Sequence, residues 1–227
     1  MLFDAGVISN NSRLPELRLM RCNVVILLFI LGVASAQSLT VGVKGGVPVN
    51  GDISGDATSE SKRYVVGPMA TVALPRAFSM EADVLYRRAG YRSSNSDILG
   101  GSYFLRGTAN SWEFPIIIRR RVLSALYAGV GYDPRVLRGS ARVNAINVVD
   151  LSGRKTYSTY TLPTNHKTTH GLVVAGGIEK RFGSLLFAPE VRYIHWSGHA
   201  LSVAGSHGFG YESRQEQWDI MLGISFP

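Results

Sequence analysis

All five histidines of this 227-residue chain lie in or beside two polar stretches, 134–168 and 197–214. His195 and Ser197 are two residues apart, so on an extended strand both side chains point to the same side. A serine next to a histidine can act as nucleophile and general base in acyl transfer, and the pair needs an acid to orient the histidine. Glu212 is the only acidic residue of the second stretch and is the candidate for that role.

The surroundings of this pair favour a structural role. A His-x-Ser match is common by chance, and a polar rim with an interfacial tryptophan, Trp196, explains the same residues. We therefore expect no enzyme, and keep an esterase based on this pair and Glu212 as the alternative. A metal site of His195, His199 and His207 is disfavoured, because the four-residue spacing of the first two suits ligands on a helix. We expect no metal and no cofactor.

The beginning of the chain has the pattern of a secretory signal peptide. An apolar run of ten residues at 24–33 follows Arg21 and ends in the small residues 34–36, the pattern of a signal peptidase site. That run is too short to span a bilayer as a helix. We expect 1–36 to be the signal peptide, with Met20 as an alternative start codon, and 37–227 to form one domain.

Charge and cysteine content narrow the class of protein. The only cysteine, Cys22, lies in the signal segment, so no disulfide framework is expected after it. Residues 1–36 hold three of the 24 basic and two of the 16 acidic residues, which leaves a formal charge of +7 on 37–227. We expect an exported basic chain to meet anionic lipid headgroups or polysaccharide rather than nucleic acid.

The elements that position these residues are strands, because the hydrophobic period is two. In 217–226, apolar residues from Trp218 onward alternate with polar or small ones, and seven other segments repeat the pattern. The candidate strands are 38–46, 63–75, 77–89, 109–120, 122–133, 169–182, 185–196 and 215–226. Long polar connections, such as 90–108, alternate with very short ones. This order predicts an all-β, eight-stranded antiparallel up-and-down transmembrane β-barrel with both termini on the short-turn side.

The polar face of these strands indicates which side meets lipid. It carries both signs of charge, and the interior of an eight-stranded barrel is just wide enough to be filled with side chains. Carboxylates and arginines can satisfy one another there, so we expect an interlocked charge network inside. Its predicted members are Glu81, Asp83, Arg87, Glu113, Arg119, Glu179, Arg181, Glu190, Arg192 and Asp219. The predicted membrane-interface aromatics are Trp112, Tyr132, Phe182, Trp218 and Phe226.

Three prolines, Pro68, Pro115 and Pro189, fall inside candidate strands. Proline lacks the backbone donor that a paired strand uses, so we expect a β-bulge at each of them. They favour the alternative of a secreted soluble barrel with its apolar side chains inside.

Three segments carry a resemblance: 112–115 (Trp-Glu-Phe-Pro), 189–193 (Pro-Glu-Val-Arg-Tyr) and 221–226 (Met-Leu-Gly-Ile-Ser-Phe). On these segments the chain resembles the small bacterial outer-membrane β-barrel family, including its PorT-like members. The resemblance spans about 38–226 and implies an eight-stranded integral barrel, but it implies no substrate. Pro227, after the terminal phenylalanine, departs from the usual ending of such chains.

The His-x-Ser element also resembles one in the outer-membrane lipid A 3-O-deacylases. That resemblance implies Ser197 as nucleophile and His195 as general base. Gly198 stands where that family has asparagine, and the spacing of Glu212 does not match it.

We therefore predict a non-enzymatic, monomeric integral protein of the cell outer membrane. Its partners are expected to be outer-membrane lipid or lipopolysaccharide and a surface protein, with no nucleic acid. Loops on a rigid scaffold commonly carry function, so the loop 134–168 is the predicted binding surface. Its candidate residues are Arg154, Lys155, Tyr157, Tyr160 and Lys167. The alternatives are a lipid A esterase and a narrow channel.

Overall fold

The computed structural model describes residues 38–55, 57–96, 102–148, 155–163, 167–206 and 209–226. From Ser38 onward these residues belong to one compact unit. The predicted signal peptide, 1–36, lies outside the described residues. Within the described ranges no helix is long and apolar enough to cross a membrane.

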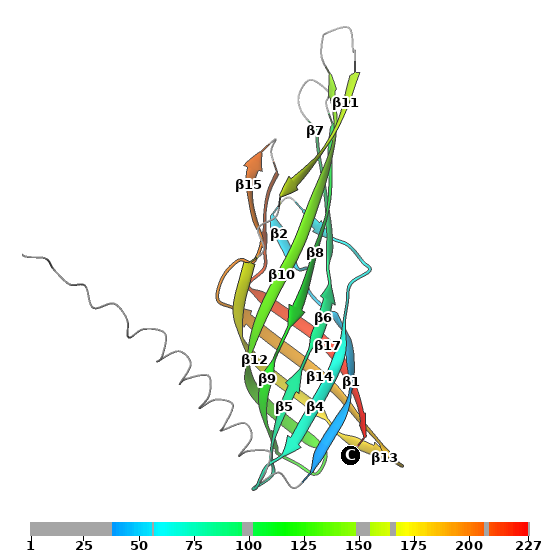
Figure 1. Ribbon diagram of the computed structural model, residues 1–227, viewed down its shortest axis with the longest axis vertical. Coiled ribbons are helices and arrows are strands. Elements are labelled where there is room, and N and C mark those ends of the chain that lie inside the picture. The colour runs from blue at the N-terminus through cyan, green and yellow to red at the C-terminus, as the bar shows by residue number, and fades with distance from the viewer. Residues whose placement is uncertain are drawn as a thin grey trace, which may run out of the picture. The chain divides into compact units, whose positions relative to one another are not determined.

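An antiparallel sheet closes on itself to form a barrel of eight strands (Figure 1). β1 (Leu39–Pro48) pairs with β4 (Tyr64–Ala73) on one side and with β17 (Glu216–Phe226) on the other, which completes the ring. The other wall strands are β5 (Phe78–Asp83), β9 (Ile116–Arg121), β10 (Leu126–Val148), β12 (Lys167–Ile178) and β14 (Leu185–Trp196), each paired with the next. β8 (Ser102–Glu113) leads into β9 and completes that wall strand. The predicted all-β, eight-stranded antiparallel barrel is confirmed.

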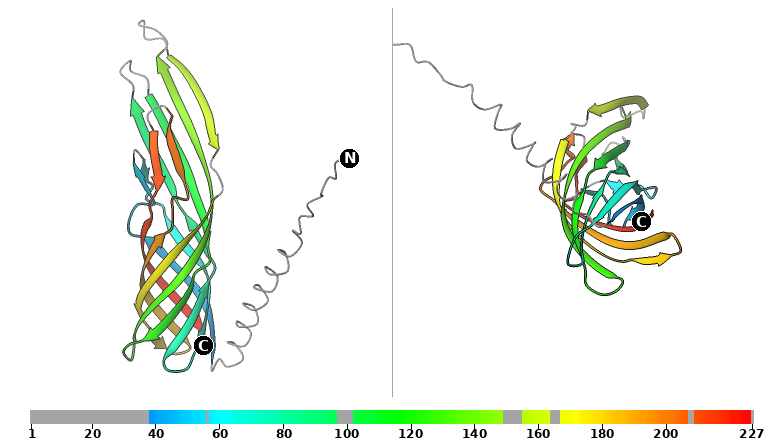
Figure 2. Two further views of the ribbon diagram at one scale, coloured as in Figure 1. Left: turned by 90° about the vertical axis from the view of Figure 1, so that its left-hand side faces the viewer. Right: turned by 60° about the horizontal axis from the view of Figure 1, so that its bottom comes forward.

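One end of the barrel is made of short turns, at 74–77, 122–125 and 183–184, the last between β13 (Lys180–Phe182) and β14. Arg76, Ala77 and Gly183 have φ angles of 60°, 63° and 61°, the left-handed conformation that tight turns require. The end of β17 lies at this turn end (Figure 2).

At the opposite, outer end the wall continues far beyond the ring of eight strands. β6 (Leu85–Arg88) and β7 (Gly90–Ser96) continue β5, and β8 pairs with both β7 and β10. β11 (Lys155–Pro163) pairs with the far half of β10, and β3 (Thr58–Ser59) pairs with β7. These strands rise together in Figure 2. A separate sheet contains β2 (Ile53–Gly55), β15 (Ser202–Ser206) and β16 (Phe209–Ser213).

The prediction that 90–108 and 134–168 are loops is therefore wrong over most of their length. Strands β7, β8, β10 and β11 occupy these regions. The error has a physical cause, because most of the outward side chains there are serine, threonine, asparagine and arginine, with exceptions such as Phe104 and Tyr157. Polar outward residues remove the alternation of apolar and polar side chains while leaving the backbone ladder intact.

The strand prolines cause no β-bulge, contrary to the prediction. The pairing offset between neighbouring strands is the same before and after Pro68, Pro115 and Pro189. The carbonyl of Pro68 still accepts a hydrogen bond from Val84 N at 3.0 Å, and that of Pro115 accepts one from Asp83 N at 3.1 Å. The barrel thus loses one donor at each proline without a shift of register.

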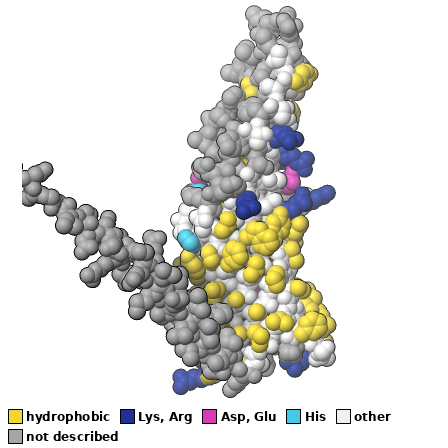
Figure 3. Space-filling model, in the orientation of Figure 1, with side chains coloured by type: hydrophobic (Ala, Val, Ile, Leu, Met, Phe, Trp, Pro, Cys, Tyr) yellow, Lys and Arg dark blue, Asp and Glu magenta, His cyan; other side chains and the backbone are white. Residues whose placement is uncertain are grey.

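Apolar side chains cover the outside of the barrel wall. Leu172 and Val130 expose 64% and 60% of their surface, whereas Val173 on the inward side exposes none. In Figure 3 the exposed apolar side chains form a belt, and lysine or arginine lies beyond both of its edges. This arrangement contradicts the soluble-barrel alternative, in which the apolar set would point inward.

Candidate functional site

Six ionised side chains fill the middle of the barrel and form what we name the central cluster: Lys44, Glu81, Asp83, Arg119, Glu190 and Arg192. They come from four strands, β1, β5, β9 and β14, and each is at most 3% exposed. Three cations face three anions, so their formal charges cancel. A buried charge is tolerated only when it is paired in this way.

Lys44 and Arg192 connect the two sides of the central cluster. Lys44 Nζ lies 2.5 Å from Glu81 Oε1 and 3.4 Å from Glu190 Oε2. Arg192 Nη2 contacts Asp83 Oδ2 at 3.0 Å and Glu190 Oε1 at 2.7 Å. Each cation therefore bridges β5 and β14, which lie across the barrel from one another in the sheet order.

Arg119 completes the central cluster from β9. Its Nη2 contacts Glu81 and lies 2.9 Å from Glu190 Oε2. Tyr127 Oη donates a hydrogen bond to Glu190 Oε2 at 2.8 Å, and the Arg119 guanidinium lies 4.4 Å from the centre of the Tyr127 ring. The arginine is thus held by carboxylates and by an aromatic face.

A second group of charges, the rim trio of Arg87, Glu113 and Asp219, lies nearer the outer end. Arg87 binds both carboxylates, with Nε 2.6 Å from Glu113 Oε1 and Nη2 2.6 Å from Asp219 Oδ2. Ser111 Oγ donates to Glu113 at 3.3 Å and Gln217 Nε2 donates to Asp219 at 2.9 Å. All three ionised side chains are buried.

Eight of the ten residues of the predicted charge network belong to these two groups. The other two lie at the turn end. Glu179 is partly buried and accepts a hydrogen bond from Arg121 Nη2 at 3.1 Å, whereas Arg181 is exposed. Arg119, Glu179 and Arg181 line a vestibule of about 390 Å³ at that end.

Sequence reasoning missed several inward residues near these two groups, among them Lys44, Tyr127, Asp133 and Arg135. Lys44 is the only charged residue of β1 and shares a face with small residues, so its alternation with Val43 was the available signal. Arg135 lies in the predicted loop 134–168, and Asp133 is the last residue of the strand predicted before it. Asp133 Oδ1 accepts a hydrogen bond from the backbone N of Phe114 at 3.0 Å.

Beyond the rim trio the interior becomes apolar. We name this region the outer plug, which consists of Ile53, Ala57, Ala89, Tyr91, Leu105, Ala109, Leu137, Ala200, Leu201 and Tyr211. Its members come from the extended wall strands and from the segments before β3 and around β15 and β16. These connections fold inward against the wall and bury the side chains that close the outer mouth.

Two tyrosines lie in the outer plug with their rings together. The hydroxyls of Tyr91 and Tyr211 are 3.3 Å apart, and the ring centres are 5.0 Å apart. Burial raises the pKa of both phenols, and for Tyr91 the hydrogen bond with Tyr211 raises it further. Tyr91 is also the cross-strand partner of Gly107, whose missing side chain leaves room for the ring.

The boundary between charged and apolar interior is formed by Arg135 and Trp196. The Arg135 guanidinium lies 3.6 Å from the centre of the Trp196 ring, and Trp196 Nε1 donates to Gln217 Oε1 at 3.1 Å. Trp196 is fully buried, so the prediction of an interfacial tryptophan at this position is wrong. It lies one residue beyond His195 and therefore faces the opposite side of β14.

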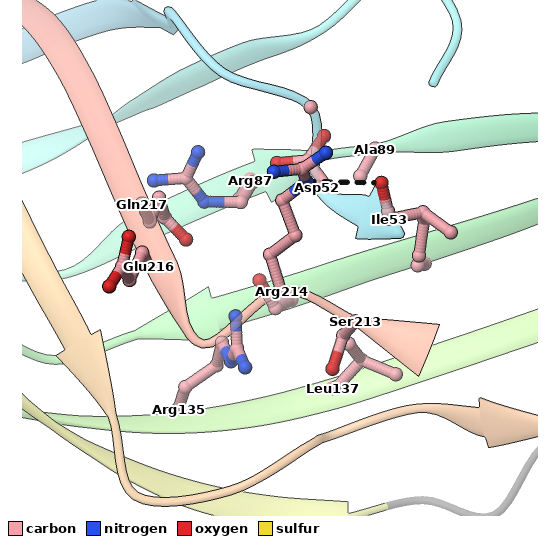
Figure 4. Close-up of a pocket in the computed structure, with 13 residues that line it drawn as sticks. Asp52, Ile53, Arg87, Ala89, Arg135, Leu137, Ser213, Arg214, Glu216 and Gln217 are labelled. Atoms are coloured by element: carbon pink, nitrogen blue, oxygen red, sulfur yellow. Dashed lines mark hydrogen bonds between the residues drawn. The ribbon is translucent and has the colours of Figure 1, made fainter. Parts of the chain in front are cut away.

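A small cavity of about 20 Å³ lies at this boundary, and Figure 4 draws the residues that line it. Arg87, Arg135 and Asp52 contribute its polar side, and Ala89 and Leu137 contribute its apolar side. Burial raises the pKa of the Asp52 carboxyl, although the neighbouring arginines act in the opposite direction.

The predicted interface aromatics Trp112, Tyr132, Phe182, Trp218 and Phe226 are all on the outer surface, between 44% and 56% exposed. Trp112 packs on Tyr86 with ring centres 5.3 Å apart, and Trp218 packs on Tyr193 at 4.8 Å. These pairs lie toward the outer end, whereas Phe182 and Phe226 lie at the turn end. Aromatic residues border the apolar belt at both ends, as in membrane barrels.

The structure does not assemble the alternative catalytic set. His195 and Ser197 are exposed at the outer end of β14, and within the described part of the chain no hydrogen bond joins them. Glu212 Oε2 lies 3.5 Å from His199 Nε2 instead of beside His195. His207 is outside the described residues, and among those described no group of three His, Cys, Asp or Glu side chains could hold a metal ion.

The predicted binding surface in 134–168 is only partly described. Tyr157 on β11 is 76% exposed. Arg154 and the side chains of Lys155, Tyr160 and Lys167 lie outside the described residues.

No family model matches the chain, and no curated protein matches it. Solved structures with a similar fold include three at low identity. Neisserial surface protein A is 12% identical, with 85% of this chain and 98% of that chain covered and a TM-score of 0.36. Ail, the attachment invasion locus protein of Yersinia pestis, is 9% identical, with 83% and 97% covered and a TM-score of 0.37. The N-terminal β-barrel domain of Pseudomonas aeruginosa OprF is 11% identical, with 85% and 98% covered and a TM-score of 0.29.

The class of this protein follows from its own structure. A closed antiparallel barrel leaves no unpaired strand edge, and an apolar belt with aromatic borders faces outward around a charge-paired interior. Lipid tolerates strands only in such closed barrels. The protein is an integral β-barrel of the cell outer membrane.

Proposed function

We propose that the protein is a non-conducting, non-enzymatic barrel that holds a rigid binding surface outside the membrane. The observation that carries this proposal is the closure of the interior at two levels. The central cluster fills the middle of the barrel, and the outer plug fills its outer mouth. With the lumen closed, the outward surface of the extended strands is what remains for recognition.

The narrow-channel alternative has little support in the interior. The vestibule of about 390 Å³ at the turn end and the cavity of about 20 Å³ at the boundary lie on different sides of the central cluster. An ion crossing the barrel would have to separate buried pairs such as Lys44 with Glu81. Removing one partner from such a pair costs several kcal/mol, about 3–5 kcal/mol in typical cases.

We further propose that the barrel is a monomer that contacts lipopolysaccharide and a protein partner through its outer strands. The segments 112–115, 189–193 and 221–226 support a PorT-like assignment within this proposal. No observation favours the esterase, because the acid that should orient His195 lies beside His199 instead.

The first test folds the purified protein in detergent and compares unheated with heated samples on SDS gels. A closed barrel migrates differently before heating. The same sample in planar bilayers is expected to give no conductance steps, and Ser197→Ala is expected to leave lipid A acylation unchanged. Regular conductance steps would contradict the closed interior, and acyl release that disappears in Ser197→Ala would contradict the non-enzymatic role.

A further inference from the structure

Three arginines lie side by side on the outward face of the extended sheet, at one level of the strands. The register pairs Arg92 of β7 with Arg106 of β8, and Arg106 with Arg142 of β10. The row continues to Thr58 of β3, opposite Arg92, and to Thr161 of β11, opposite Arg142. All five side chains are exposed. We name these three guanidinium groups the arginine row.

The arginine row is unfavourable for the sheet that carries it. Like charges directly opposite one another on neighbouring strands destabilise the pairing. Among the described residues Glu60 is the one carboxylate in contact with the row, with Oε1 3.0 Å from Arg106 Nε. The Arg106 side chain is nevertheless 78% exposed, so its guanidinium still faces solvent. An arrangement that costs stability and leaves cations exposed is suited to an anionic ligand.

The next level of the same face carries groups that suit a sugar. Phe104 of β8 lies between Ser94 and Asn144 in the register, and half of its surface is exposed. Thr159 Oγ1 donates to Asn144 Oδ1 at 3.0 Å. A surface pocket of about 540 Å³ joins the two levels, and Arg92, Arg106, Phe104 and Asn144 are among the residues that line it.

The height of the arginine row indicates which part of the membrane surface it meets. Arg106 is six residues along β8 from Trp112 in the outer aromatic border, roughly 20 Å along the strand at 3.3 Å per residue. At the strand tilt of about 35–45° that is usual in membrane barrels, this distance is about 14–16 Å along the membrane normal. The headgroup layer beyond the hydrocarbon is only about 5–8 Å thick. Arg88 and Arg138, nearer the border, lie at headgroup height, whereas the arginine row extends past it into the surface glycan layer.

We propose that the arginine row and Phe104 bind a phosphorylated sugar in the core of lipopolysaccharide. Guanidinium groups bind phosphate through two parallel hydrogen bonds, and three of them can span neighbouring phosphates. Phe104 provides an apolar surface for the C–H face of a sugar ring, and Asn144 provides a hydrogen-bonding group for its hydroxyls. This proposal rests on the proposed function, because it requires the extended strands to stand outside the membrane.

The test uses the phosphorylated inner-core oligosaccharide released from lipopolysaccharide, titrated calorimetrically into the detergent-folded protein. The test variant replaces Arg92, Arg106 and Arg142 with glutamine. A matched control removes the same charge at the turn end, as Arg76→Gln, Arg120→Gln and Arg121→Gln. Loss of charge-assisted contacts is expected to weaken binding by more than about tenfold in the test variant, with the control unchanged.

Two further comparisons separate phosphate recognition from sugar recognition. Dephosphorylating the oligosaccharide is expected to weaken its binding to the natural protein as strongly as the triple substitution does. Phe104→Leu is expected to weaken oligosaccharide binding several-fold while leaving weak binding of inorganic pyrophosphate unchanged. Lysine at the three arginine positions keeps the charge and is expected to restore only part of the affinity, because it lacks the planar guanidinium.

The proposal is overturned if the triple glutamine variant binds as tightly as the natural protein, or if the dephosphorylated oligosaccharide binds equally well. Binding of a sulfated heparin fragment but not of the phosphorylated core would also overturn it, because the source of the anion would be wrong. Each sample is first checked for the heat-dependent gel shift. A folded, non-conducting barrel that does not bind the oligosaccharide would leave the proposed function standing while removing this inference.

Discussion

The same strands enclose two interiors of opposite chemistry. On β8, Glu113 points inward and Trp112 outward within the belt, whereas Leu105 points inward and Arg106 outward beyond it. The alternation of buried and exposed side chains along β8 is the same in both regions. The medium around the outer face changes from lipid to water, and the inward side chains change with it. A barrel interior can therefore be closed by paired charges or by apolar packing.

The two interiors differ in how their contacts depend on one another. In the central cluster each cation touches several carboxylates, so removing one partner leaves a buried charge unpaired. In the outer plug each apolar side chain contributes through the area that it buries, and the loss of one is local. The comparison predicts a global effect for a substitution in the first region and a local effect in the second.

The largest effect is expected for Arg192→Ala. This substitution removes contacts to Glu81, Asp83 and Glu190 and should destabilise the barrel by about 3–5 kcal/mol. Urea unfolding in lipid vesicles measures the change. Arg120→Ala, on the exposed face of β9, is the control and should change stability by less than about 0.5 kcal/mol. If the two variants were equally stable, the result would contradict a structural role for the central cluster.

Leu105→Ala tests the outer plug. A cavity at this buried position should cost about 3 kcal/mol, confined to the outer region. Limited proteolysis should then cut the connections near Ile53 and Leu201 faster, while the heat-dependent gel shift is retained. Phe104→Ala, on the outward face of the same strand, is the control. Loss of the gel shift in Leu105→Ala would mean that the two interiors unfold together.

Gly107→Ala tests the packing of the tyrosine pair. A Cβ at Gly107 would overlap the ring of Tyr91 on the neighbouring strand. The ring must move away from Tyr211, at a cost of about 1–3 kcal/mol for overpacking. The near-ultraviolet circular dichroism of the folded protein should lose intensity. Gly198→Ala, where an added Cβ meets no atom within 4 Å, is the matched control.

The smallest effect is expected from alkaline pH. Burial raises the pKa of Tyr91 and Tyr211 in the folded state, so folding favours their neutral forms. This contribution is fully present below the unfolded pKa of about 10 and is lost as pH rises above it. Tyrosinate absorbance should therefore place these two phenols among those that ionise late, together with faster proteolysis of the plug. The Tyr91→Phe/Tyr211→Phe double variant should lose two phenols from the delayed phase, and an unchanged titration would contradict the burial.

The sequence predicts the belt far better than the region outside it. Residues such as Trp218 and Ile220 alternate with Asp219 because lipid and interior demand different side chains, and this contrast is visible in the chain. Beyond the membrane Arg106 and Thr108 face water while Leu105 and Gly107 face inward, and the shorter, mixed pattern resembles a loop. Strand length there depends on backbone pairing between β7, β8 and β10, which composition does not report.

The charge network shows the same difference between what alternation predicts and what only strand pairing determines, here for single residues. Glu81 and Arg192 could be assigned inward from alternation alone. Lys44 could be assigned inward from the same alternation with Val43. Its pairing with Glu81 and with the other carboxylates that Arg192 contacts depends on the register between strands that are distant in sequence, which alternation does not give. The prediction for Trp196 is wrong for a related reason. Neighbouring residues of a strand point to opposite faces, so an error of one residue exchanges a lipid-facing position for an interior one.

The position of the central cluster has a consequence for assembly. Lys44, Glu81 and Arg119 belong to the half of the sheet that begins with β1, whereas Glu190 and Arg192 belong to the half that ends with β17. In an open sheet these halves do not meet, so Lys44 and Arg119 lack their contacts with Glu190, and Arg192 lacks its contacts with Glu81 and Asp83. Closure of the ring by β1 and β17 brings the two sets together at once. Ring closure thereby completes the pairing of the buried charges, so a partly inserted open sheet would hold them in lipid with fewer partners than the closed barrel provides.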